Sequence, residues 1–203
     1  MPEARAISTS VTMYRCNARL AWLATALLLA IPASGISVPR RYEVDAARSQ
    51  VDFRLHYFGV FNPGGHFRRA AGTVAFDPGH WETVAVAVRI PVDSLETRPA
   101  LWRSELLGPG FFDSGHYPNI EFSSTRAEQT TNATADVWGS LTLRGVTRPV
   151  LLKARIVPAP TAGAFAIEAE ARLQRSAFGL DAVLPFASDE VTIILHLTVV
   201  PMR

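Results

Sequence analysis

Residues 138–153 read WGSLTLRGVTRPVLLK, and this stretch decides the fold. Leu141 and Leu143 alternate with polar neighbours, and the alternation resumes after a short turn with Val150 and Leu152. Alternation of apolar and polar residues with a period of two is typical of half-buried β-strands. The stretch therefore predicts two strands folded back on each other.

The turn between these strands depends on Gly145, which supplies the positive φ that a tight hairpin requires. Pro149 cannot donate to a strand ladder, so it predicts a bulge or a locally edge-like position. A single hairpin is marginally stable in water, and its apolar face needs a cover. More strands of the same kind are the nearest sequence that can provide it.

The same alternation recurs along most of the chain. Strands are expected at residues 42–58, 66–76, 83–90, 120–125, 134–144, 147–157, 165–173 and 191–200. About eight strands separated by turns, with no alternating helices, predict an all-β fold, either an extended eight-stranded antiparallel barrel or a sandwich. A barrel of eight strands is just wide enough to hold one small ligand.

One short helix is expected after the third strand, at residues 98–107. Thr97 is a candidate N-cap, and Gly108 with Pro109 would end the helix. Trp102 and Leu106 then lie on one side of it, four residues apart. They are either the inner face of a lid or the packing stripe of the helix.

An apolar run, LAWLATALLLAI, occupies residues 20–31 after three arginines and before a group of small residues. This order is typical of a secretory signal peptide, so residues 1–35 are predicted to be a leader cleaved after Gly35, with Met13 as an alternative start. The alternative is an uncleaved anchor helix, but twelve apolar residues are short for about 30 Å of hydrocarbon. The mature protein is expected in the periplasm or secreted, with no stable membrane span.

The remaining chain divides into a linker at residues 36–41 and a barrel domain at residues 42–203. Three of the 20 basic and one of the 18 acidic side chains lie in residues 1–35, so the mature chain is formally neutral. A neutral surface gives no electrostatic footprint for nucleic acid.

The one cysteine, Cys16, precedes the apolar run, so the exported protein has no disulfide. A homodimer is compatible with the sequence.

Catalytic and metal-binding patterns are absent from the sequence. The five histidines have no ligand spacing, whereas a metal site needs three or four converging ligands. No nucleophile elbow or phosphate-binding glycine loop occurs. We expect no enzyme activity, no metal and no cofactor other than a bound lipid. His56 and His66 flank one loop, so an enzyme that uses both is the principal alternative.

Aromatic and aliphatic side chains are the remaining candidates for a binding site. Pockets for small molecules are mostly apolar, with a few polar groups. The candidates lie on inward-facing strand positions or near the loops and the helix, and ordinary core packing is the alternative for each. The predicted ligand-binding residues are Phe53, Leu55, Tyr57, Phe58, Phe61, Phe67, Val86, Val88, Trp102, Leu106, Phe111, Phe112, Leu141, Leu143, Leu152, Phe178 and Ile193.

Four motifs in order resemble the YceI-like family of small bacterial proteins. They are GTVAFDP at residues 72–78, FFD followed by YPNIEF within residues 111–122, GSLTLRGVTRPV at residues 139–150, and RSAFG at residues 175–179. The resemblance spans nearly the whole mature chain. It implies a lipocalin-like barrel, usually periplasmic, that binds a polyisoprenoid, an isoprenoid quinone or another long-chain amphiphile in its lumen.

The sequence departs from the family pattern in two places. Residues 105–110 read ELLGPG where the family often has His-Leu-x-Ser-x-Asp, and residues 57–59 read YFG where it usually has His-Leu-Gly. Both segments are expected near the barrel mouth, so the head group of the ligand stays open. Arg54, Arg68 and Arg69 could meet a polar end, although solvated surface arginines are the more ordinary reading.

We therefore expect a lipid-binding protein in which tail length matters more than head group. Each buried CH₂ gains roughly 0.8 kcal/mol, so a long enclosed chain needs no specific hydrogen bonds. A packed barrel that serves as an interaction module is a further alternative, and it would show a filled lumen and a large exposed apolar patch.

Overall fold

The computed structural model describes residues 39–57, 64–77, 80–159, 163–181 and 187–202, apart from the side chains of His56, Tyr57 and Ala187. The predicted signal peptide, its cleavage site and the first residues of the linker lie outside the described residues. The strands are β1 (Arg40–Val44), β2 (Gln50–Tyr57), β3 (Gly64–Phe67), β4 (Ala71–Phe76), β5 (Ala85–Pro91), β6 (Leu95–Thr97), β7 (Asn119–Gln129), β8 (Thr134–Leu143), β9 (Val146–Pro158), β10 (Phe165–Gln174) and β11 (Ala187–Pro201). The helices are α1 (Trp102–Leu107) and the 3₁₀ turns η1 (Trp81–Thr83), η2 (Val92–Ser94) and η3 (Arg175–Phe178).

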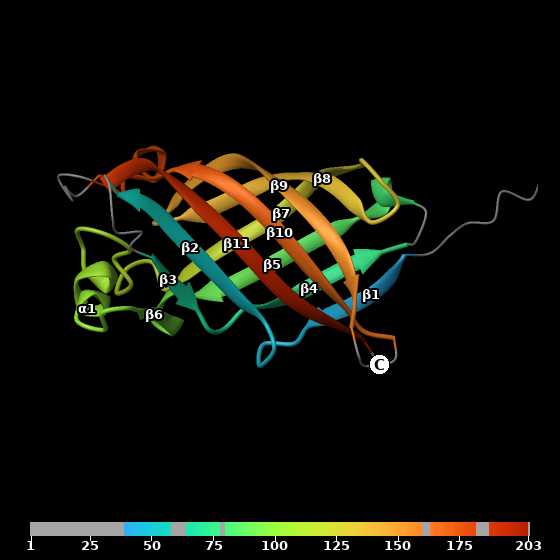
Figure 1. The fold of residues 1–203 in the computed structure, drawn as a ribbon, viewed down its shortest axis with the longest axis horizontal. Coiled ribbons are helices and arrows are strands. Elements are labelled where there is room, and N and C mark those ends of the chain that lie inside the picture. The colour runs from blue at the N-terminus through green and yellow to red at the C-terminus, as the bar shows by residue number, and fades with distance from the viewer. Residues whose placement is uncertain (1–38, 58–63, 78–79, 160–162, 182–186, 203) are drawn as a thin grey trace, which may run out of the picture. The chain divides into compact units, whose positions relative to one another are not determined.

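The strands form a closed antiparallel barrel, which confirms the predicted fold (Figure 1). The order is β1-β4-β5-β7-β8-β9-β10-β11, and β11 pairs back with β1, so eight strands close the sheet. The first part of β11 pairs instead with β2, which is followed by β3 and β6. The strands expected at residues 42–58 and 66–76 are therefore each broken in two. Because β1 begins at Arg40, the last two residues of the predicted linker belong to the sheet.

The break between β1 and β2 has a local cause in Asp45. Its carboxylate accepts hydrogen bonds from the backbone N–H of Ala47 at 3.0 Å and from Nε of Arg48 at 2.8 Å. A short acidic side chain that binds the backbone two residues further on makes a turn of its own. Asp45 thus competes with the strand ladder, and β2 starts only at Gln50.

The hairpin of β8 and β9 turns through Arg144 and Gly145, which have φ values of 51° and 72°. Two consecutive positive φ values give the turn whose twist matches that of the strands. Pro149 lies opposite Ser140 without a register shift, and β10 pairs with β9 only from Lys153 onward. The edge-like alternative for Pro149 is therefore confirmed, and the bulge is not observed.

The predicted helix is real but starts later than expected. It begins at Trp102 rather than Arg98, and it ends at Leu107, before Gly108, as predicted. Thr97 is not its N-cap, because Thr97 lies in β6 and its hydroxyl donates to the carbonyl of Pro99 at 3.0 Å. A proline disfavours helical backbone angles at the residue before it, so Pro99 keeps Arg98 out of the helix. Among the described residues, no helix is long and apolar enough to cross a membrane.

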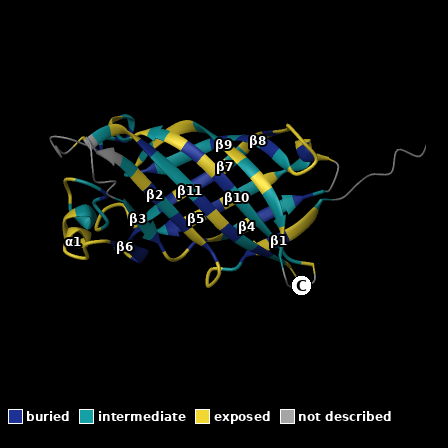
Figure 2. Ribbon diagram, in the orientation of Figure 1, coloured by how far each residue is buried: buried dark blue, intermediate teal, exposed yellow. Residues whose placement is uncertain are grey.

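Burial alternates along the barrel strands, with inward side chains covered and outward ones exposed (Figure 2). At the β1 end of the barrel, aromatic rings pack edge to face. The ring centroids of Tyr42 and Phe165 are 4.8 Å apart, and those of Phe76 and Trp81 are 5.1 Å apart. These rings fill the barrel interior at that end, whereas α1 lies at the other end (Figure 1).

Candidate ligand-binding cavity

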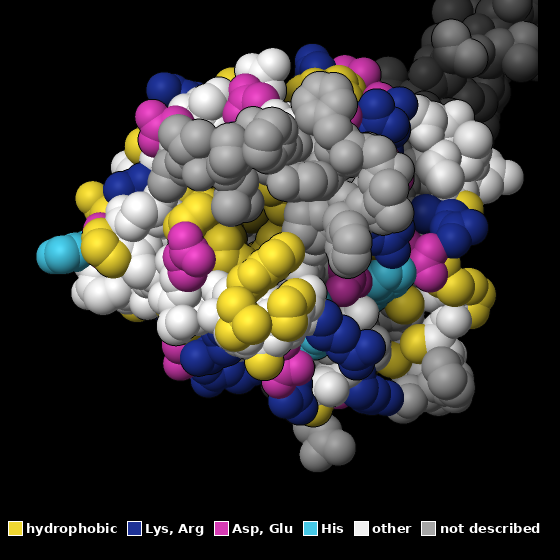
Figure 3. All heavy atoms as spheres, turned by 60° about the vertical axis from the view of Figure 1, so that its left-hand side comes forward, with side chains coloured by type: hydrophobic (Ala, Val, Ile, Leu, Met, Phe, Trp, Pro, Cys, Tyr) yellow, Lys and Arg dark blue, Asp and Glu magenta, His cyan; other side chains and the backbone are white. Residues whose placement is uncertain are grey.

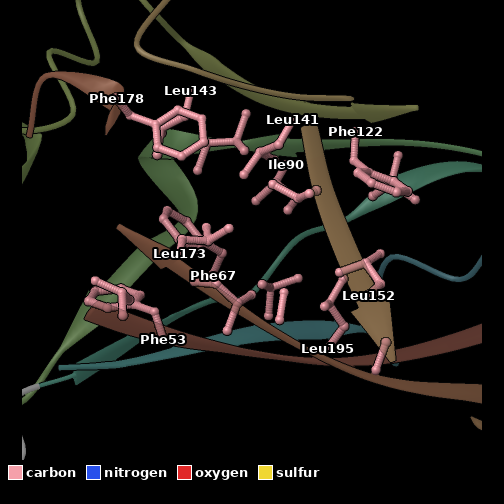
Figure 4. A pocket seen from close by; sticks show the side chains of 18 of the residues that line it. Phe53, Phe67, Ile90, Phe122, Leu141, Leu143, Leu152, Leu173, Phe178 and Leu195 are labelled. Carbon is pink, nitrogen blue, oxygen red and sulfur yellow. The ribbon is translucent and has the colours of Figure 1, made fainter. Parts of the chain in front are cut away.

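The inward side chains leave an internal cavity of about 190 Å³. Its wall is built by β2, β3, β5, β7, β8, β9, β10 and β11, by η3 and by the α1 segment. Figure 4 shows apolar side chains of opposite walls, such as Phe53, Leu141 and Leu152, pointing toward one common space. This apolar surface exists because strict alternation places every second residue of each strand inside.

The free space is long and narrow. On β10 the lining runs from Ile167 to Leu173, and on β11 it runs from Val191 to Leu197. Six residue steps span about 20 Å along a strand, which is about 15 Å along the barrel axis because barrel strands tilt by about 35–45°. Since only about 190 Å³ is spread over a lining of that length, the cavity is a narrow tunnel rather than a round chamber.

The tunnel approaches the surface beside α1. Trp102, Leu106 and Phe111 contribute to its lining, and 36% of Trp102 is exposed to solvent. Seen from this end, hydrophobic side chains lie at the bottom of a hollow (Figure 3). We call this region the mouth of the tunnel.

Two arginines hold the α1 segment in place over the mouth. Arg103 donates from Nε to the carbonyl of Leu95 at 2.7 Å and from Nη2 to that of Asp93 at 2.6 Å. Arg144, at the tip of the β8–β9 hairpin, donates to the carbonyls of Pro109, at 2.7 Å, and Gly179. The hairpin that decides the fold therefore also fastens the residues that follow α1 and η3.

One charged residue, Arg175, belongs to the tunnel lining, although nearly all of the tunnel surface is apolar. It donates from Nε to the carbonyl of Ser188 at 3.2 Å and from Nη1 to that of Leu180 at 2.6 Å. Nearby, the hydroxyl and backbone N–H of Ser176 donate to Asp189 at 2.6 and 2.9 Å. These hydrogen bonds, with a smaller contribution from the charge of Arg175, hold the pKa of the Asp189 carboxyl below its usual value. Asp189 is therefore a carboxylate at neutral pH.

The structure brings most of the predicted site residues together. Three of them, Tyr57, Phe58 and Phe61, have side chains outside the described residues. The others all line the tunnel, and their contact with a ligand stays a prediction: Phe53, Leu55, Phe67, Val86, Val88, Trp102, Leu106, Phe111, Phe112, Leu141, Leu143, Leu152, Phe178 and Ile193.

Sequence reasoning missed a further set of lining residues. Most of them continue the same alternation along strands already recognised, so the period of two was the signal that could have found them. They are Val51, Gly64, Ile90, Ile120, Phe122, Val137, Val150, Ala154, Ile167, Ala169, Ala171, Leu173, Arg175, Leu180, Val191, Leu195 and Leu197. The sequence identifies Arg175 only as the first residue of the RSAFG motif.

The histidines with described side chains lie outside the tunnel. His66 is 3.3 Å from Glu96, and His196 is 3.9 Å from Asp52. No group of three potential metal ligands occurs in the described part of the chain. In the described part of the chain His66 does not line the tunnel, so the tunnel does not support catalysis by His66. The side chain of His56 lies outside the described residues.

The arginines considered for a polar ligand end also lie on the outer surface. Arg54 is exposed, Arg68 pairs with Glu96 at 2.7 Å, and Arg69 pairs with Asp93 at 2.6 Å. The hydrogen bond from Arg68 is the main cause that lowers the pKa of the Glu96 carboxyl. None of these three arginines reaches the described tunnel lining.

Comparison with known proteins places the chain in a family. A family model described as a YceI-like domain matches residues 42–199. Protein YceI of Escherichia coli O157:H7 is 31% identical over 169 residues, which cover 80% of this chain and 88% of that protein.

Solved structures share the fold. The crystal structure of Burkholderia cenocepacia BcnA matches with a TM-score of 0.70 at 24% identity, covering 76% of this chain and 98% of that one. A polyisoprenoid binding domain from Saccharophagus degradans, implicated in plant cell wall breakdown, matches with a TM-score of 0.62 at 14% identity, covering 82% of this chain and 100% of that one. Together with the family model, which spans nearly the whole barrel, these findings show that the chain belongs to the YceI-like family.

Proposed function

We propose that the protein binds a long-chain amphiphile, such as a polyisoprenoid or an isoprenoid quinone, and carries or sequesters it in the barrel without altering it. The observation that carries this proposal is the long apolar tunnel that approaches the surface beside α1. The fold shared with a domain described as polyisoprenoid binding supports it.

The shape of the tunnel favours a flexible chain over a compact ring system. An apolar cavity of about 150 Å³ in another protein accepts one benzene molecule. The volume of about 190 Å³ therefore admits only a short part of a long chain at one time. A longer ligand needs side chains at the mouth to move, and Trp102 and Leu106 on the exposed helix are placed to do so.

The apolar wall makes tail length the main source of affinity. Each buried CH₂ gains roughly 0.8 kcal/mol, so an isoprene unit of five carbons gains about 4 kcal/mol before the costs of ordering the chain. Affinity should rise with each added unit until the tunnel is full. Beyond that length, further units stay in water and add little.

Displacement of a fluorescent apolar probe by isoprenoid alcohols of increasing length tests this function. We expect affinity to rise steeply over the first units and then to level off. Equal affinity for the shortest and the longest alcohol would contradict the proposal, and so would a failure of every alcohol to displace the probe.

We also propose that the protein acts outside the cytoplasm after cleavage following Gly35. The order of basic, apolar and small residues in the first 35 positions supports this. N-terminal sequencing of the protein from the periplasmic fraction and the culture medium tests it. The expected first residue is Ile36, and a protein found only in the cytoplasm with its leader intact would contradict the proposal.

A further inference from the structure

The tunnel ends inside the barrel, before the strands that form its wall end. Its lining stops at Ile167 on β10 and at Leu197 on β11, although both strands extend beyond these residues. The next inward residues are Phe165 and Val199, which pair with each other across the two strands. Neither of them lines the tunnel. The lumen is therefore closed at the level of Phe165 and Val199.

Four aromatic rings lie at this level, at the end of the barrel opposite α1 (Figure 1). The ring centroid of Phe165 is 4.8 Å from that of Tyr42 and 6.0 Å from that of Phe76. Phe76 in turn packs against Trp81, with the ring centroids 5.1 Å apart. We call these four residues the aromatic floor, and none of them lines the tunnel.

The aromatic floor reaches across the lumen. Phe76 belongs to β4 and Phe165 to β10, and in the sheet these two strands are separated by β11 and β1. Contact between their rings therefore spans the interior instead of following one wall. Tyr42, Phe76 and Trp81 are buried, and Phe165 is partly buried.

Small side chains line the tunnel just above the aromatic floor. Ala154 of β9 and Ala169 of β10 pair directly, and both belong to the lining. Ala169 is followed on the inward face by Ile167 and then by Phe165. Alanine leaves more room than a larger apolar residue, so the wall at this level does not obstruct a tail. A tail that enters beside α1 can therefore extend to the aromatic floor.

We propose that the aromatic floor sets the longest tail that the protein can enclose, and that Phe165 is the residue at which the tail stops. This inference rests on the lipid binding proposed above and adds the specificity determinant for tail length. Phe165 has this role because it follows the lining on β10 and contacts both Tyr42 and Phe76. Close-packed side chains yield little, so a longer tail leaves its remaining units outside the mouth.

Displacement of a fluorescent apolar probe by isoprenoid alcohols of increasing length locates this limit. Phe165→Ala removes six carbon atoms, about the size of one isoprene unit of five carbons. The variant should continue to gain affinity for about one unit beyond the alcohol at which the wild-type protein levels off. Since burial of each CH₂ is favourable, that unit should improve affinity by about tenfold or more after the cost of ordering the chain.

A second variant shifts the limit in the opposite direction. Ala169→Leu adds three carbon atoms directly above the aromatic floor and removes no core contact, so the affinity should level off at a shorter alcohol. Leu95→Ala is the matched control, because Leu95 is fully buried but neither lines the tunnel nor belongs to the aromatic floor. Its affinity should level off at the same alcohol as that of the wild type.

The outcomes separate this inference from the proposed function. An unchanged length limit in folded Phe165→Ala protein would overturn the role of Phe165 and leave lipid binding intact. If Phe165→Ala fails to fold, Ala169→Leu decides the question, since an unchanged limit there would mean that the tail never reaches the aromatic floor. Wild-type protein from which no alcohol displaces the probe would overturn both proposals.

Discussion

Replacing Ala171 with leucine tests whether the barrel interior is a tunnel or a packed core. Ala171 lies in β10 opposite Ile193 of β11, lines the tunnel and is 5% exposed. Leucine adds three carbon atoms at this position. If they enter empty space, their burial raises the free energy of unfolding by about 2 kcal/mol at roughly 0.8 kcal/mol for each carbon.

The size of the cavity makes such a gain reasonable. Cavities in protein cores cost about 24 cal/mol for each Å³, so an empty space of about 190 Å³ costs about 4.5 kcal/mol. Leucine at position 171 recovers part of this cost and at the same time narrows the path of a ligand. Ala171→Leu should therefore gain stability and lose affinity for isoprenoids.

Urea denaturation of the ligand-free protein and probe displacement measure the two effects. Thermal unfolding should shift upward by about 4–8 °C for a gain of about 2 kcal/mol in a domain of this size. Ala135→Leu is the matched control, because Ala135 is 1% exposed but does not line the tunnel. Overpacking at that position should cost about 1–3 kcal/mol.

Destabilisation of the protein by Ala171→Leu as large as that by Ala135→Leu would contradict an empty tunnel. Such a result would mean that the interior is already filled at position 171. A stabilised variant with unchanged affinity would place the ligand elsewhere.

Three further predictions concern the wall, the pH dependence and the mouth. A Cβ at Gly139 would lie 2.4 Å from the Phe122 ring, so Gly139→Ala should lower the free energy of unfolding in urea by about 1–3 kcal/mol. The pKa of the Asp189 carboxyl is lower in the folded protein than the ordinary value of 3.8, so its ionised form stabilises the fold. This stabilisation is present above pH 3.8 and is lost as the pH falls through the lower pKa of the folded state. Urea midpoints of Asp189→Asn should lack this acid-dependent part, and a pH profile equal to that of the wild type would contradict the assignment. Arg144→Ala removes the hydrogen bonds to the carbonyls of Pro109 and Gly179. Exchange of backbone amide hydrogens should therefore become faster in the segments that follow α1 and η3 and stay unchanged in β10.

The strands were predictable from sequence because each one buries a single face. Leu141 and Leu143 alternate with polar residues, and the structure places both on the tunnel wall. The breaks within the first two strands were not predicted, since the one at Asp45 depends on a side chain that binds its own backbone. The predicted start of the helix was wrong because Thr97 lies in β6 and pairs with Gly65 of β3. Strand pairing here overrides a local capping pattern.

The site was predictable only in part. Periodicity shows which face of a strand is apolar, but it does not show how much space is left between opposite faces. The RSAFG motif at residues 175–179 forms a turn, and its first residue also belongs to the tunnel lining, which the motif alone does not show. That position results from the closure of the barrel, which brings the end of β10 beside residues distant in sequence.

The central claim is that the barrel encloses an apolar chain. Mass spectrometry of the organic extract from natively purified protein tests it most directly, with Ala171→Leu protein purified alongside. We predict a long-chain amphiphile in the wild-type extract and much less of it in the variant extract. Equal amounts in both extracts would contradict the claim, and so would wild-type protein that yields no lipid and takes up none on incubation with farnesol.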